Sequence, residues 1–190
     1  MMKSLVMWLL WAAPFAALSQ GVFSNSANIT LQQVIQDYPS RFKNISGELL
    51  SNNPQSTDYV SKVKVEGSEN AVVTRYSPVD GKEAYGWKCL LMVSEDFSAV
   101  SGKYQELHAQ IRNSIIKIDG QKPFILNGNY ESPTTEKRFV TSDFYLLPSS
   151  GEMKNLKIEL TMEYYVTEWK VALQVYENDA FDEEYQVNTF

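Results

Sequence analysis

The chain has 190 residues, a formal net charge of −6 and a single cysteine. With 44% hydrophobic and 13% aromatic residues, it has the composition of a globular protein and enough length for one domain with its own core. The lysines and arginines form no basic stripe or polybasic cluster, which argues against nucleic acid or an anionic membrane as a partner. One cysteine cannot form an internal disulfide, so disulfide-stabilised scaffolds are excluded.

The first residues predict a secretory signal peptide. Lys3 precedes an apolar run over residues 5–17, shorter than the roughly 20 residues that span a bilayer. Residues 17–19, Ala-Leu-Ser, suit a signal peptidase. We therefore expect residues 1–19 to be removed and the mature protein to be periplasmic or extracellular. An uncleaved N-terminal anchor is the alternative, and no later segment is apolar enough to predict a membrane span.

The first predicted element after a loose lead is an amphipathic helix that starts at Thr30. Thr30 and Gln33 have the spacing of a capping box, and Pro39 is expected to end or kink the helix. The apolar face, at spacings of three and four, consists of Leu31, Val34, Ile35 and Tyr38.

Between residues 49 and 93 the sequence predicts a loop and three strands. The loop, residues 49–58, is rich in Asn, Ser and Pro. Residues 59–67 and 70–77 are expected to be short strands, and a turn containing Pro, Asp and Gly leads to a third strand at residues 83–93. This third strand is apolar on both faces, which is typical of a central strand.

A second amphipathic helix is predicted over residues 94–117, with Asp96 or Ser98 as its N-cap. Its apolar stripe consists of Val100, Tyr104, Leu107, Ile111 and Ile115. The sequence DGQKP then breaks the helix.

The remainder of the chain is predicted to be mainly strand. Residues 123–132 and 136–148 flank a polar loop. Residues 156–164 and 169–175 alternate between apolar and polar, which predicts an antiparallel hairpin with one buried and one wet face. Residues from about 178 to 190 form an acidic tail that we expect to be peripheral.

These elements predict an α+β fold, in which two amphipathic helices pack on a largely antiparallel sheet of about six to seven strands. Residues 20–190 are expected to form a single domain. A helix followed by strands occurs twice in this order, so an internal duplication is an open possibility, although the residues themselves do not repeat.

Few residues offer catalytic or metal chemistry. His108 is the sole histidine, and Cys89 lies in the apolar run WKCLLMV, where a buried, inert thiol is the expected state. A Cys-His dyad is therefore disfavoured, and one His with one Cys is a poor set for zinc. No catalytic residue, metal site or cofactor is predicted. Asn28 and Asn44 begin Asn-x-Ser/Thr sequons, which matter only in a host that glycosylates exported proteins.

Aromatic side chains are the one feature that suggests binding. Trp87, Tyr164 and Trp169, with His108, are the predicted ligand-binding residues, because aromatics beside a sheet face suit an apolar ligand or a protein partner. The alternative is that these side chains fill the core between helices and sheet.

Three segments carry a resemblance: DYPSRFKNISGELL, YVSKVKVEGSENAVV and FSAVSGKYQELHAQIRNSI. Over residues 30 to 118 their order and spacing resemble small exported α+β domains of Bacteroidota, which are mostly of unknown function. The resemblance implies export and an α+β fold, and it implies no activity.

The leading hypothesis is an exported, soluble binding or interaction domain for an unknown protein, peptide or apolar small molecule. A small secreted hydrolase with an unidentified active site and an accessory subunit of a cell-surface complex are the alternatives.

Overall fold

The computed structural model describes residues 26–79, 82–149 and 151–177. The predicted signal peptide (1–19), the acidic tail (178–190) and the centre of the predicted turn at residues 80–81 lie outside this range. The helical elements are α1 (Ser26–Asp37), the 3₁₀ helix η1 (Tyr38–Ser40), α2 (Phe97–Ile111) and the 3₁₀ helix η2 (Gly151–Asn155). The strands are β1 (Ser46–Asn52), β2 (Ser56–Ser61), β3 (Asn70–Val79), β4 (Lys82–Ser94), β5 (Ile115–Ile116), β6 (Phe124–Gly128), β7 (Phe139–Leu147), β8 (Leu156–Tyr165) and β9 (Glu168–Glu177).

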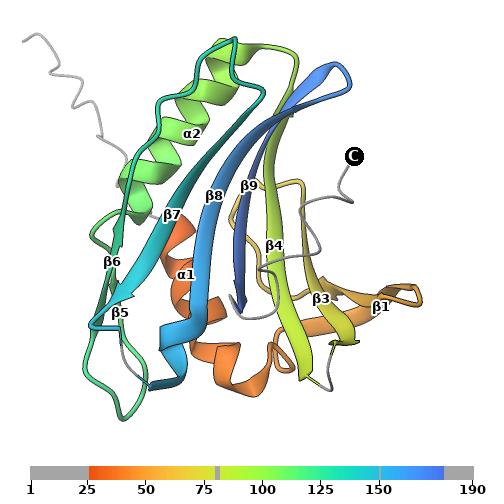
Figure 1. Cartoon of the computed structure of the whole chain (residues 1–190), viewed down its shortest axis with the longest axis vertical. Helices are drawn as coiled ribbons and strands as arrows, with labels where there is room; N and C mark the ends of the chain where they lie inside the picture. Colours follow the sequence, from red (N-terminus) through yellow and green to blue (C-terminus); the bar gives the residue numbers. More distant parts are fainter. Residues whose placement is uncertain (1–25, 80–81, 150, 178–190) are drawn as a thin grey trace, which may run out of the picture.

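The strands form one antiparallel sheet in the order β1-β2-β3-β4-β9-β8-β7-β6-β5 (Figure 1). Each half of the chain is a helix followed by a meander, and the two meanders meet where β4 pairs with β9. The α+β class and the antiparallel sheet are confirmed. The described residues contain nine strands, so the predicted number of six to seven was too low. Common ancestry of the two halves stays a prediction.

The additional strands are β1 and β5, and the sequence pattern predicted neither of them for a physical reason. Residues 49–58 were expected to be a loop, but only the turn around Asn53 and Ser56 is irregular, and strands lie on both sides of it. β5 has only two residues, too few for any alternation to be visible. The predicted strand at 59–67 was also misplaced, because β2 ends at Ser61 and the segment after it is irregular.

The helix boundaries differ from the prediction, at the start of α1 and at both ends of α2. α1 already includes Ser26, so Thr30 is not its N-cap; the Thr30 hydroxyl is buried and donates to the carbonyl of Lys64. α2 is capped by Asp96, whose carboxylate accepts from the backbone amides of Ser98 and Ala99. α2 ends at Ile111, so Ile115 leaves the predicted stripe and is 55% exposed on β5.

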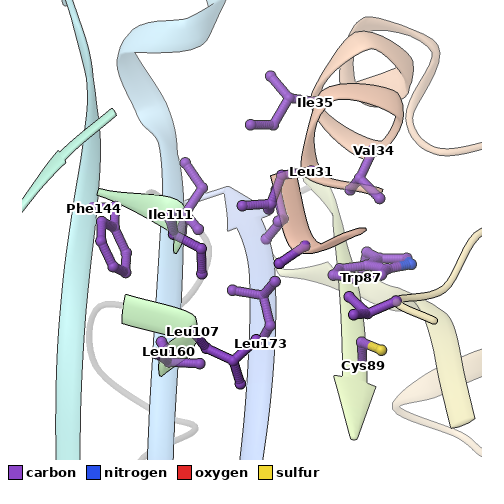
Figure 2. Close-up of a cluster of buried hydrophobic side chains, with 14 of the residues drawn as sticks. Leu31, Val34, Ile35, Trp87, Cys89, Leu107, Ile111, Phe144, Leu160 and Leu173 are labelled. Atoms are coloured by element: carbon purple, nitrogen blue, oxygen red, sulfur yellow. The ribbon is translucent and has the colours of Figure 1, made fainter. Parts of the chain in front are cut away.

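The core lies between the two helices and one face of the sheet. Figure 2 shows Leu31, Val34 and Ile35 of α1 and Leu107 and Ile111 of α2 directed toward side chains of β4, β8 and β9. Trp87, Leu160 and Leu173 fill the space below the helices and are essentially inaccessible to solvent. The predicted alternation of β8 and β9 is confirmed, since their apolar residues face this core. No helix of residues 26–79, 82–149 and 151–177 lies on the opposite face of the sheet (Figure 1), and we call it the helix-free face.

Candidate interaction surface

The four residues predicted to bind a ligand do not form one site. Trp87 lies on β4 and is 1% exposed, and its indole N–H donates to Ser61 Oγ at 3.0 Å and to the carbonyl of Val63 at 3.1 Å. The indole thereby fixes the irregular segment after β2 against the sheet. Both the indole N–H and the ring surface are therefore in contact with the core. This placement agrees with the alternative that the aromatic side chains fill the core.

Trp169 and Tyr164 meet at the far end of the sheet, where β8 turns into β9. Their ring centroids are 5.0 Å apart, and Trp169 also packs edge-on against Phe97 at the start of α2, at 5.1 Å. Trp169 is buried and Tyr164 half-buried. This aromatic cluster anchors the beginning of α2 to the β8–β9 hairpin, away from Trp87.

His108 lies on α2 above β7, whereas Cys89 lies on β4, three strands away in the sheet. The imidazole packs between Tyr130 and Phe144, with centroid distances of 4.8 and 5.3 Å, and burial followed by the charge of Arg112 lowers its pKa. Cys89 is fully buried on β4, and burial raises the pKa of its thiol. Because β9 and β8 lie between β4 and the Phe144 strand β7, roughly 14 Å of sheet separates the two, and no dyad forms.

The helix-free face instead presents an unexpected row of apolar side chains. Ile115 on β5 pairs with Ile125 on β6, and Ile125 pairs with Leu147 on β7. They are 55%, 48% and 43% exposed, and Tyr145, two residues before Leu147 on the same face, is 50% exposed. We call these four residues the apolar strip. The strip crosses β7, β6 and β5 in register. These three strands form one side of the sheet (Figure 1).

The strip arises because β6 and β7 are apolar on both faces while helices cover only one. Phe124, Leu126, Phe144 and Leu146 point toward the helices and are buried, so their strand neighbours must point to the other face. The consecutive apolar residues in the runs FILN of β6 and FYLL of β7 indicate in the sequence that both strand faces are apolar. In β4 the same two-faced pattern marks a central strand, whereas β6 lies next to the edge.

A polar band adjoins the apolar strip at the centre of the helix-free face. The Lys157 ammonium lies 2.9 Å from Glu159 and 3.6 Å from Asp143, and Glu159 pairs in register with Gln174 on β9. Burial acts to lower the pKa of Lys157, but its hydrogen bond and charge interaction with Glu159 outweigh burial and raise it. Charged side chains therefore lie beside the apolar strip, an arrangement that resembles the polar rim and apolar centre of a docking surface.

The two sequons lie in the first helix and in the turn that follows it, where Asn28 is half-buried and Asn44 is exposed. Asn28 lies within α1, and the side-chain amide of Asn44 donates to the Asp37 carboxylate at 2.5 Å. Across the described ranges there is no group of three or more metal-ligating side chains and no helix long and apolar enough to cross a membrane.

No known protein family matches this chain, and no curated protein matches it significantly.

Proposed function

We propose that this protein is an exported, non-catalytic binding domain that docks a partner protein through the apolar strip of its helix-free face. The observation that carries the proposal is the row Ile115–Ile125–Leu147, in register across three strands and with each side chain more than 40% exposed. Single exposed apolar residues are ordinary, but adjacent ones in a patch mark interaction sites. Export rests on the signal-like features of residues 1–19.

A protein partner fits this strip better than a small apolar ligand does. The strip lies on a sheet face, where side chains stand outward from the strands, so it offers contact area for another surface. The space between helices and sheet is filled by Trp87, Leu160 and Leu173. Tyr145 adds an aromatic ring with a polar tip, a side chain that is enriched at the centres of protein interfaces.

The test is photo-cross-linking in the native host. A p-benzoylphenylalanine in place of Tyr145 is expected to give a protein adduct of defined mass, because the reactive ring would stand within the interface. Ile125→Lys in the same chain is expected to remove the adduct, since a lysine in the centre of a dry contact would be desolvated. The side chain of Ile125 is already 48% exposed, so Ile125→Lys should leave the fold intact by circular dichroism.

The control is a cross-linker in place of Val166, which is 75% exposed at the β8–β9 turn, away from the strip. Identical adducts from positions 145 and 166, or an adduct at 145 that survives Ile125→Lys, would contradict the proposed docking surface.

A further inference from the structure

A second feature lies on the opposite face of the sheet and concerns charge. Beyond the end of α1, the helix-side surface of β2, β3 and β4 holds a cavity of about 160 Å³. We call it the cationic pocket; it is lined by Arg41, Lys43, Ser46, Tyr59, Val73, Arg75 and Tyr85. Three of these side chains are cationic, in a chain whose net charge is −6.

The sheet register brings the floor and one wall of the pocket together. Arg75 of β3 pairs directly with Tyr85 of β4, and Tyr59 of β2 pairs with Val73 of β3, all on the helix-side face. Tyr85 is 8% exposed, whereas the Arg75 side chain is 48% exposed and reaches the opening. The floor of the pocket is therefore aromatic and aliphatic, and the Arg75 guanidinium lies beside it.

The turn after α1 supplies the other wall, and it is held in an unusual conformation. Arg41 and Phe42 both have left-handed backbones, with φ values of 56° and 54°, although neither is glycine. The fully buried Phe42 ring anchors the turn, and the Asp37 carboxylate accepts from the backbone amides of Asn44 and Ile45. Arg41 is thereby placed with its guanidinium carbon 5.7 Å from the centre of the Tyr85 ring. Strained residues held by their surroundings are concentrated at functional sites.

Only one carboxylate balances the arginines of this pocket in the part of the chain that is described. Glu83 forms ion pairs with Arg75 and, at 3.5 Å, with Arg41, and it accepts a hydrogen bond from Tyr85 at 2.5 Å. The hydrogen bonds from Tyr85 and then Arg75 lower the pKa of Glu83, so it is ionised at neutral pH. Each guanidinium has five N–H donors, more than one shared carboxylate can satisfy.

We propose that the cationic pocket binds the oxyanion of a small ligand, a carboxylate or phosphate carried on a ring-shaped or apolar body. Arg41 and Arg75 would bind the oxyanion through charge-assisted hydrogen bonds, with Lys43 adding positive charge. Tyr59, Val73 and Tyr85 would contact the attached ring. A volume of about 160 Å³ is below the usual range of drug-sized pockets, so it suits the anionic end of a ligand and one ring. This inference is independent of the apolar strip.

The test is calorimetric titration of the full protein with phenyl phosphate and with benzoate, with neutral benzamide as the matched probe. Saturable binding of at least one anion is expected, and whichever binds more tightly identifies phosphate or carboxylate as the preferred group. Arg75→Gln is expected to weaken that binding by roughly tenfold or more, because it removes a charge-assisted contact. Glu83→Gln is expected to strengthen it, because the intramolecular competitor for both arginines is lost.

The opposite directions of these two effects keep the test decisive, since partial unfolding cannot raise affinity. Lys88→Gln, an equal loss of positive charge at an exposed position on the helix-free face, should change binding less than twofold, because distant exposed charges are screened. The proposal is overturned if neither anion saturates, if benzamide binds as tightly, if Arg75→Gln and Lys88→Gln weaken binding equally, or if Glu83→Gln weakens it.

Discussion

At the scale of single residues, the side chains that could offer reactivity or ligand contacts are buried in the packed interior. Trp87, Cys89 and His108 are each less than 10% exposed. The imidazole of His108 is a special case: Nε2 is buried and has no hydrogen-bond partner among the described residues. Burial, and then the charge of Arg112, lowers the pKa of His108, so the neutral form is favoured and protonation would place a charge at a buried position.

His108 should therefore make the protein less stable as the pH falls. Its folded-state pKa is lowered, so below an unfolded pKa of about 6.5 the unfolded chain binds the proton more readily. The free energy of unfolding is expected to fall between pH 7.5 and 5.5, with a slope of at most about 1.4 kcal/mol per pH unit. His108→Leu should remove most of this slope in urea titrations at both pH values. Because His108 is the sole histidine, an unchanged slope would contradict the assignment.

At the scale of elements, the turn between α1 and β1 is stabilised by hydrogen bonds to one buried carboxylate. The Asp37 carboxylate accepts from the amides of Asn44 and Ile45 and from the side chain of Asn44, although the residue is only 8% exposed. These bonds close the turn around the two left-handed residues. The carboxylate thus stabilises a backbone conformation that Arg41 and Phe42 would not adopt alone.

Asp37→Ala should lower the free energy of unfolding by about 2–4 kcal/mol, because it leaves buried backbone donors without an acceptor. It should also weaken anion binding, because Arg41 would lose its fixed position. Chemical denaturation measures the first effect and the phenyl phosphate titration the second. Asp119→Ala, at an exposed loop position, is the control and should change stability by less than about 0.5 kcal/mol. Equal effects at the two positions would show that the turn does not depend on its carboxylate.

At the scale of the whole molecule, two meanders share one sheet and one core. The β4–β9 ladder joins them, and α1 contacts α2 above it. Neither half has a complete core, because Trp87 from the first half and Leu173 from the second lie in the same cluster. We therefore expect the halves to unfold together.

Leu173→Ala should lower the free energy of unfolding by about 2–5 kcal/mol, since it leaves a cavity in the centre of the shared core. The loss should appear equally in the hydrogen exchange of slow amides in β3 and in β7, which lie in different halves. Val166→Ala, at an exposed turn position, should change stability little. If protection fell only in β7, the two halves would be separate folding units.

The sequence predicted the elements whose pattern is long and local. The alternation of β8 and β9 and the two apolar faces of β4 could be recognised because each depends on neighbouring residues. The N-cap of α2 was narrowed to Asp96 or Ser98 for the same reason, and the structure shows Asp96. β1 and β5 were missed, because a two-residue strand exists only through its partner and the composition of β1 is that of a loop. The left-handed conformation at Arg41 and Phe42 was not predicted, because neither residue is a glycine, the residue type that usually indicates a positive φ.

The candidate sites were harder to predict because topology creates both of them. Ile125 becomes notable only once β6 is known to lie near the sheet edge with helices on its other face. Arg41 and Arg75 lie far apart in the chain, and only the sheet and the Asp37 turn bring them to one carboxylate. The aromatic residues chosen from the sequence were conspicuous for the reason that makes them good core residues, their size.

The position of β9 has a consequence for the time course of folding. β9 ends at Glu177 and pairs with β4, so that Gly86 lies opposite Tyr176. The ladder at the middle of the sheet is thus a contact of very long sequence separation, which raises contact order and slows folding. During synthesis the core cannot close before β9 has been made, because β9 completes the ladder with β4. Until that moment β4 has an unpaired edge, and such an edge can pair with another chain.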